Sequence, residues 1–154
     1  GRERLRLEIN ILGNSCGGCS YHTFPYTAQI PVRINGKCET RTFECSEDVW
    51  DVIDLIIEET REFNEEKGKG FDIAKSVNAQ LPFFTCNNLL LNREDQKDIA
   101  RYIYCKEFGI QPYKGSYGEQ PASWVDRAFV IKSALAKKEK EQIDASNKSN
   151  NNRV

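Results

Sequence analysis

Three residues near the N-terminus have types and spacing that allow chemistry. Cys16 and Cys19 form a Cys-Gly-Gly-Cys motif, and His22, the single histidine of the chain, follows three residues later. Cysteines at this spacing bring two sulfurs together, and such a pair either binds a metal ion or cycles between dithiol and disulfide. The two intervening glycines allow the backbone to curl closely around an ion. The motif therefore predicts a cysteine-centred site.

Zinc is the metal that this donor set favours, because structural zinc takes four sulfur or nitrogen ligands in a tetrahedron. Cys16 and Cys19 supply two ligands, and we expect the others from Cys45 and Cys38, with His22 in reserve. Cys38 and Cys45 flank a predicted strand, but their odd spacing puts them on opposite faces unless a bulge intervenes. The alternative is that all four cysteines are loop thiols or small packed residues without a ligand role.

Thiol–disulfide exchange is the rival chemistry for Cys16 and Cys19. In thioredoxin-type proteins the first cysteine begins a helix, whose dipole lowers the pKa of the thiol. Here Cys19 precedes Ser-Tyr-His-Thr-Phe-Pro25, a poor helix, and no βαβ unit follows. These two features argue against thiol–disulfide exchange, so a redox protein is the alternative hypothesis and not the first one. Cys86, in a loop, and Cys105, in a predicted helix, are interpreted as structural.

The composition limits the class of protein. With 154 residues, 39% hydrophobic and 29% charged, the chain suits one soluble domain with a core of its own. A net charge of −1 argues against a general nucleic-acid binder but does not exclude a local basic patch. A zinc-dependent nucleic-acid-binding regulator therefore stays a further alternative. We find no membrane span and no apolar segment of a signal peptide, and we expect cytoplasmic, reduced thiols. No pattern of catalytic side chains is evident, which predicts that the protein is not an enzyme.

The elements that would position the site are predicted from periodicity. Residues 5–12 alternate apolar and polar side chains, which is typical of a half-buried strand. Residues 28–34 and 38–45 form a hairpin around Asn35-Gly36, the strongest short turn signal, with the register left open. Together they predict a small antiparallel sheet.

Three helices are predicted to pack against this sheet. The first begins at Ser46 and ends at Lys67-Gly68-Lys69-Gly70. The second begins at Asn92, with Asp95 in a capping-box-like position, and ends at Gly109. Pro121 opens the third. We read residues 71–91 as a connection. The chain is thus predicted to be an α+β domain over 1–145 with a disordered tail over 146–154.

Two stretches resemble a known group of proteins. The sequence from Asn92 to Gly109, followed by Tyr117-Gly-Glu-Gln-Pro-Ala-Ser-Trp124, resembles uncharacterised proteins of tailed bacteriophages and prophages from virion-morphogenesis gene clusters, tail-assembly factors included. The resemblance implies a non-enzymatic assembly protein, located in the bacterial host cytoplasm or on the virion. Its partners would be other phage or host proteins, and a homo-oligomer stays open. The resemblance carries no catalytic residues.

The same stretch supplies the candidate interaction residues, Tyr117, Gln120, Pro121 and Trp124. Proline fixes the entry of the following helix, and Trp124 lies one turn later, where it can pack against the preceding loop. We therefore expect a non-catalytic interaction protein, stabilised by zinc at the cysteine cluster.

Overall fold

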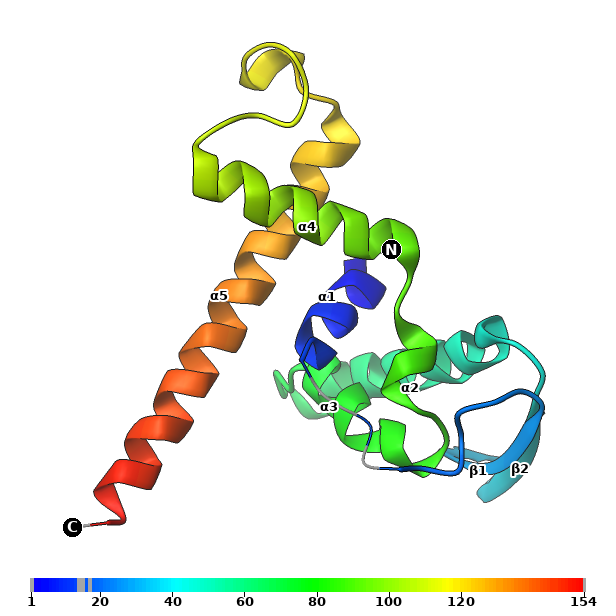
Figure 1. Ribbon diagram of the computed structural model, residues 1–154. Coiled ribbons are helices and arrows are strands. Elements are labelled where there is room, and N and C mark those ends of the chain that lie inside the picture. Colours follow the sequence, from blue (N-terminus) through cyan, green and yellow to red (C-terminus); the bar gives the residue numbers. More distant parts are fainter. Residues whose placement is uncertain (1, 14–15, 17, 154) are drawn as a thin grey trace. The chain divides into compact units, whose positions relative to one another are not determined.

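The computed structural model describes residues 2–13, 16 and 18–153. It is an α+β protein with one two-stranded antiparallel sheet among the described residues and predominantly helical structure elsewhere (Figure 1). The contacts within the chain divide it into two compact units, Ile11–Leu91 and Gly1–Asn10 with Asn92–Val154, and the single domain over 1–145 stays a prediction. Among the described residues, no helix combines the length and apolarity that crossing a membrane requires.

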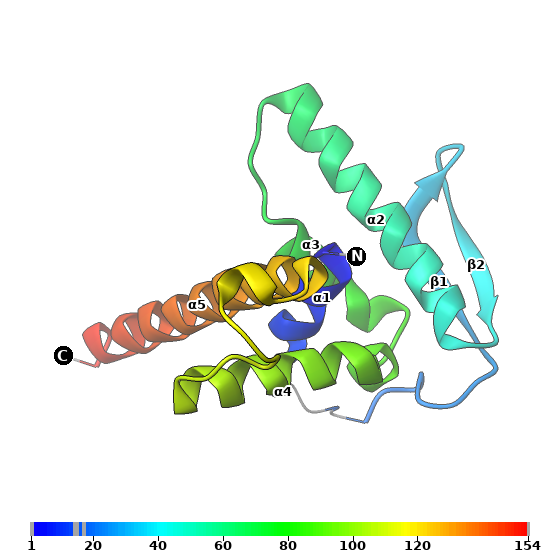
Figure 2. The same ribbon diagram turned by 90° about the horizontal axis from the view of Figure 1, so that it is seen from above.

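The unit Ile11–Leu91 contains the hairpin, and helix α2 lies across the hairpin (Figure 2). Its elements are β1 (Tyr26–Ile34), β2 (Lys37–Phe43), α2 (Ser46–Lys67), α3 (Ile73–Gln80) and the 3₁₀ turns η1 (Leu81–Phe83) and η2 (Asn87–Leu90). Inward-facing side chains of β1 and the apolar stripe of α2 are buried, as alternation and helical spacing predict. The largest of them are Ile30, Trp50, Ile53 and Ile56, and Phe43 at the end of β2 is buried as well.

The hairpin turn is the two-residue turn that the sequence predicts. Asn35 and Gly36 have φ of 51° and 78°, as a type I′ turn requires, and Ile34 pairs with Lys37. The register then shifts between Gln29 and Arg33, around Pro31, which has no N–H to give to the ladder. The register that the sequence left open is therefore not uniform, because the pairing set by the turn does not continue along the whole hairpin.

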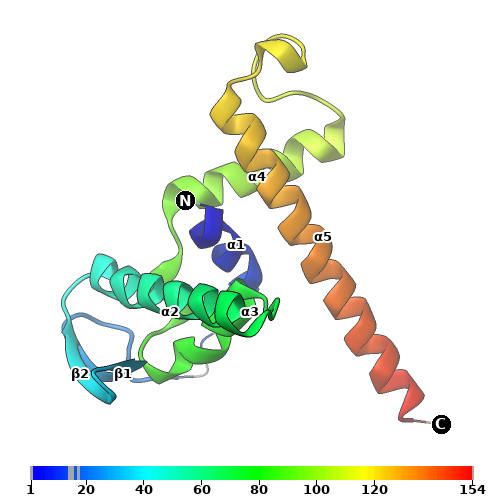
Figure 3. The ribbon, with the colours of Figure 1, turned by 180° about the vertical axis from the view of Figure 1, so that it is seen from behind.

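The second unit, Gly1–Asn10 with Asn92–Val154, contains no strand among its described residues, and we call it the helical unit. Its elements are α1 (Arg2–Ile11), α4 (Arg93–Phe108), α5 (Ala122–Asn151) and the 3₁₀ turn η3 (Tyr117–Glu119). Helix α5 crosses α4 and continues past it (Figures 1 and 3). Asn92 caps α4 by accepting the N–H groups of Glu94 and Asp95, and Gly109 ends it in the left-handed conformation with φ of 63°, so both predicted caps are confirmed.

The prediction of a strand over residues 5–12 is wrong, because α1 covers this segment. Leu5, Leu7, Ile9 and Ile11 are all buried. On a helix, Leu5 and Ile9 share one side while Leu7 and Ile11 share the opposite side, so alternation also fits a helix that is buried on two sides. The segment is rich in Arg, Leu and Glu, which favour helix.

Two further predictions need correction. Residues 71–91 are not only a connection, since Asp72 caps the short helix α3 by accepting the N–H of Lys75. The tail predicted to be disordered from residue 146 continues α5 to Asn151, although its side chains from residue 142 are exposed. Extending an existing helix costs far less than starting one, and no tertiary contact is needed.

A buried polar cluster in the helical unit replaces the predicted capping box. Glu8, with no exposed surface, accepts the Asn92 N–H at 3.2 Å and the Gln96 amide at 3.4 Å. Burial and then the neighbouring Asp95 raise the pKa of Glu8 to about 8. Asp95 pairs with Arg127 instead of capping α4.

Candidate metal centre

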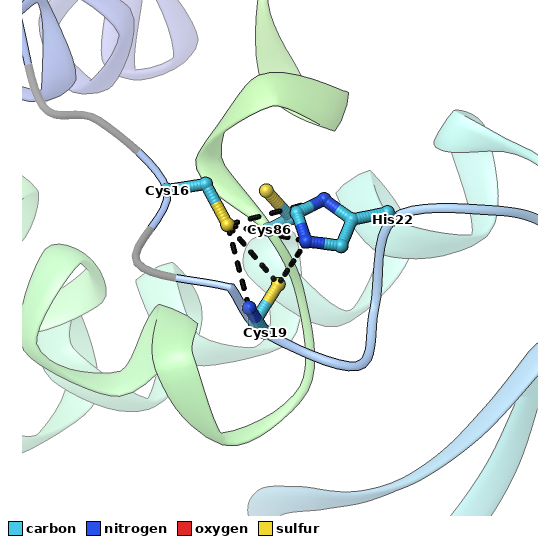
Figure 4. A group of neighbouring side chains, drawn as sticks. All are labelled: Cys16, Cys19, His22 and Cys86. Carbon is cyan, nitrogen blue, oxygen red and sulfur yellow. Dashed lines mark hydrogen bonds between the residues drawn. The ribbon is translucent and has the colours of Figure 1, made fainter.

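Three potential ligands lie together on the cysteine loop, which we define as the described residues 16 and 18–25. The Sγ atoms of Cys16 and Cys19 are 3.6 Å apart, and Nε2 of His22 lies 3.3 Å from the first and 3.6 Å from the second (Figure 4). Cys16 and Cys19 are half-buried and His22 is exposed. The structure therefore brings together the motif and its neighbouring histidine.

The fourth member of the group is Cys86, which we had interpreted as structural. It lies between η1 and η2, is 3% exposed, and faces the cysteine loop (Figure 4). One ligand atom from each of Cys16, Cys19, His22 and Cys86 lies within 4.8 Å of all the others. The sequence carries no second Cys-x-x-Cys motif that would have pointed to Cys86.

These separations suit one ion. Zn–S bonds of about 2.3 Å in a tetrahedron put two sulfurs about 3.8 Å apart. The distances within the cysteine loop, 3.3–3.6 Å, and the 4.8 Å limit for the whole group are close to this value. The three thiols of Cys16, Cys19 and Cys86 and the imidazole of His22 therefore form a donor set of the structural zinc type.

Backbone groups prepare one of the sulfurs to carry negative charge. The N–H groups of Gly18 and Cys19 donate to Sγ of Cys16 at 3.4 and 3.5 Å. These two hydrogen bonds lower the pKa of the Cys16 thiol to about 7. Burial has the opposite effect on Cys86 and raises the pKa of its thiol to about 11. One thiol thus loses its proton readily, while the other needs a nearby cation to do so.

An aromatic row lies beside the group. The rings of Phe24, Tyr26 and Phe43 stack with centroids 5.5 and 5.1 Å apart, and Tyr26 also packs against Tyr21 at 5.1 Å. Burial raises the pKa of the Tyr26 hydroxyl, and this effect is larger than the opposing effect of Thr85. The charges of Cys19 and other neighbours add to the rise. Its Oη is buried without a hydrogen-bond partner among the described residues. The aromatic row thus lies close enough to the thiols of Cys19 and Cys86 for their charges to act on Tyr26.

Cys38 and Cys45 do not join the group, so their prediction as metal ligands is wrong. Cys38 pairs with Arg33 near the hairpin turn. Seven residues separate Arg33 from Tyr26, where β1 leaves the cysteine loop, which is roughly 23 Å of strand. Cys45 lies beyond the end of β2, at the cap position of α2, and both side chains are exposed.

The four predicted interaction residues lie around the start of α5, in the helical unit. Gln120 is 8% and Trp124 is 7% exposed, whereas Tyr117 is 70% exposed. We predicted Pro121 as the first residue of the helix, but it occupies the cap position, and α5 begins one residue later at Ala122. These residues thus combine a buried anchor with an exposed aromatic ring.

Comparison of the chain with protein-family models, with curated proteins and with solved structures finds no match. The metal centre therefore depends on the geometry of its own donors.

Proposed function

We propose that this is a non-catalytic protein-interaction protein whose cysteine loop is held by one structural zinc ion, bound by Cys16, Cys19, His22 and Cys86. The observation that carries the metal assignment is the convergence of four ligand atoms within 4.8 Å, drawn from a loop and from a distant segment of the chain. A zinc ion would fix these two segments to each other within the same unit.

The donor set supports a structural rather than a catalytic role for the ion. Four protein ligands complete a tetrahedron and leave no open position for water or substrate, which catalytic zinc sites retain. The interaction role is supported by the exposed aromatic side chains around the start of α5 and by the resemblance of this stretch to phage morphogenesis proteins. A place in phage assembly, with phage or host partners, is the form of this role that we propose.

Metal content tests the zinc assignment. The full chain, purified without added chelator, should contain about one equivalent of zinc by elemental analysis. Cys86→Ser should lose most of it, whereas Cys105→Ser, a matched change on α4 outside the group, should retain it. A metal-free protein with freely titratable thiols, or equal zinc in both variants, would contradict the assignment.

Thiol–disulfide exchange is a second candidate, favoured by the 3.6 Å separation of the Cys16 and Cys19 sulfurs and by the lowered pKa of Cys16. In that reaction the Cys16 thiolate attacks one sulfur of a substrate disulfide and releases the other as a thiolate. The Cys19 thiolate then attacks the mixed disulfide. The protein ends with a Cys16–Cys19 disulfide, and the substrate ends with two thiols.

The same protein sample separates the two candidates. A redox protein should reduce a model disulfide such as oxidised glutathione stoichiometrically and lose this ability in Cys16→Ser. A structural zinc site should resist, because zinc-bound thiolates are shielded, and should react only after a chelator removes the ion. Reaction of the zinc-loaded protein at an unchanged rate would favour the redox candidate.

A further inference from the structure

An apolar cavity of about 160 Å³ lies in the helical unit, at the start of α5. Trp124, Val125 and Ala128 line it from α5, and Tyr102 lines it from α4. The cavity is thus built mainly from side chains on helices, which position their atoms more firmly than loops do. We call it the aromatic cavity.

The loop that lines one side of the cavity is fixed by the side-chain amide of Gln120. The side chain of Gln120 donates to the carbonyl oxygens of Tyr113 and Gly115, both at 2.9 Å, and of Ser116 at 3.4 Å, and it accepts the N–H of Tyr113 at 3.3 Å. The Arg101 guanidinium lies 5.4 Å from the ring centre of Tyr113 and 5.6 Å from that of Trp124. The cavity is therefore largely preformed, so that an occupant pays little to organise it.

Size selects the kind of occupant. Sites for drug-sized ligands span about 300–1,000 Å³. A cavity of about 150 Å³ lined by apolar side chains is known to accept benzene. At about 160 Å³, the aromatic cavity holds one phenyl ring or one leucine side chain, and a larger occupant would extend out of it.

The rim indicates that this side chain belongs to a protein. Tyr117 and Phe129 line the cavity and are 70% and 61% exposed. Exposed aromatic rings around a small apolar pocket are typical of interface hot spots, where one anchor side chain inserts and its neighbours exclude water.

The charge of one lining residue indicates which kind of residue the partner carries next to the inserted side chain. Lys132, exposed on α5, is the one charged residue of the lining, and the amides of Gln111 and Gln120 are its polar members. A partner segment seated here would gain from a carboxylate near Lys132 and lose from a cation.

We propose that the aromatic cavity is a docking site for a partner protein, accepting one phenylalanine- or leucine-sized side chain with an acidic residue next to it. This inference rests on the interaction role proposed above and names the chemistry of the partner. The cavity and the metal centre lie in different units, so each can be tested without the other.

Blocked dipeptides are the probes, added to the isotope-labelled full chain and followed by NMR. Acetyl-Phe-Glu-amide should shift the Trp124 indole and Ala128 methyl signals saturably, in the millimolar range expected for so few atoms. Acetyl-Phe-Lys-amide should bind about fivefold more weakly. Acetyl-Ala-Glu-amide, which lacks the anchor, should leave both signals unchanged.

Matched variants on α5 separate the contribution of the Lys132 charge to dipeptide binding from that of the apolar space beside Ala128. Lys132→Glu should reverse the preference between the two phenylalanine dipeptides, while Lys140→Glu, on the exposed part of the helix, should keep it. Ala128→Phe should fill the cavity and abolish the shifts, whereas Ala145→Phe should not. Because Lys132 is exposed, its variant should fold normally even if Ala128→Phe does not.

Several outcomes would overturn the proposal. They are the absence of saturable shifts, equal binding of the two phenylalanine dipeptides, or an unchanged preference in Lys132→Glu. Shifts of the same signals on raising the protein concentration alone would make a second copy of the chain the occupant. Zinc measured on the same sample keeps the tests apart, because loss of the metal with retained dipeptide binding contradicts the metal centre alone.

Discussion

Two loops of this protein are held in different ways. The glutamine loop, residues 109–121, is organised by the buried amide of Gln120, which forms hydrogen bonds with three residues of the loop backbone. The cysteine loop instead gathers three thiols and an imidazole, with two backbone N–H groups directed at one sulfur. The first loop satisfies its polar groups from within the chain, whereas the second assembles donors that an ion would satisfy.

The two loops also differ in how the side chains that organise them respond to pH. An amide is neutral at every accessible pH, so Gln120 holds its loop under all conditions. The thiols of Cys16 and Cys86 have pKa values of about 7 and about 11, so the free loop carries an uneven set of protons near neutral pH. A zinc ion held by these residues would remove this difference, because zinc keeps its thiol ligands deprotonated. The comparison teaches that a side-chain amide can do for one loop what we propose a zinc ion does for the other.

Removing the metal should have the largest effect, and it should be confined to one unit. The double change of Cys16 and Cys19 to serine should lower the free energy of unfolding of Ile11–Leu91 by several kcal/mol, less than the about 10–16 kcal/mol by which zinc stabilises small zinc-finger peptides, because this unit has its own apolar core. Hydrogen exchange should show the loss in this unit and not in the glutamine loop.

The matched control for this change is serine at Cys38 and Cys45, the exposed cysteines outside the group. It should leave zinc content and exchange rates near those of the unchanged protein. Equal losses of protection in both double variants would remove the distinction between the two loops.

Gln120→Ala should break the glutamine loop and spare the cysteine loop. It leaves the N–H of Tyr113 and the carbonyl groups of Tyr113 and Gly115 without their partner, which should cost about 3 kcal/mol. The measurement is urea unfolding followed by exchange of the Tyr113 amide. Gln142→Ala, an exposed change on α5, serves as the control, and zinc content should stay at one equivalent in both.

Glu8 adds a dependence on pH to the helical unit. Its pKa is about 8 in the fold against 4.5 in the unfolded chain, so the folded state holds a proton that the unfolded state has lost. The stability that this proton contributes is full below pH 4.5 and is lost as pH rises through about 8. The limit is about 1.4 kcal/mol per pH unit. We expect a loss of about 3 kcal/mol between pH 5 and pH 8. The pKa of about 8 already includes the opposing effects of the Gln96 amide and the Asn92 N–H, which stabilise the carboxylate.

Glu8→Gln should remove this dependence. Its unfolding free energy should change little between pH 5 and pH 8, while that of the unchanged protein falls, as followed by hydrogen exchange of α4. The exposed Glu139→Gln should behave as the unchanged protein does. Parallel pH profiles for all three proteins would show that the Glu8 carboxyl is not the source.

Local signals in the sequence predicted much of the fold. The turn at Asn35-Gly36, the cap at Asn92 and the helix ends at Gly68 and Gly109 each depend on a few neighbouring residues, and the structure has all of them. The segment 5–12 was predicted wrongly because an alternating pattern can also be a helix buried on two sides, and only tertiary contacts decide between them.

The metal centre shows the same limit. Cys16 and Cys19 are close in sequence, and their association followed from spacing alone, whereas His22, which also joins the group, was held only in reserve. Cys86 is far along the chain, and only the packing of the segment after η1 brings it to the cysteine loop. Cys38 and Cys45 were preferred because they flank a strand near the motif, but a strand carries its two ends far apart.

Glycine changes should give the smallest difference between the loops. Gly18 and Gly115 have φ of 92° and 106°, where a side chain is strained by about 1–2 kcal/mol. Gly18→Ala should weaken zinc binding by about tenfold, because the strain opposes the conformation that directs its N–H to Cys16. Gly115→Ala should leave zinc affinity unchanged, as measured by competition with a chelator, and lower only the stability of the glutamine loop. Equal zinc affinity in both variants would argue that Gly18 is not needed for the site.

The most direct test of the metal centre is zinc K-edge X-ray absorption of the purified full chain. The four ligands require three sulfurs at about 2.3 Å and one nitrogen at about 2.0–2.1 Å around a single zinc ion. Cys86→Ser should remove one sulfur from this shell or the ion altogether. A protein without zinc, or a shell of oxygen with fewer than three sulfurs in the unchanged chain, would contradict the account.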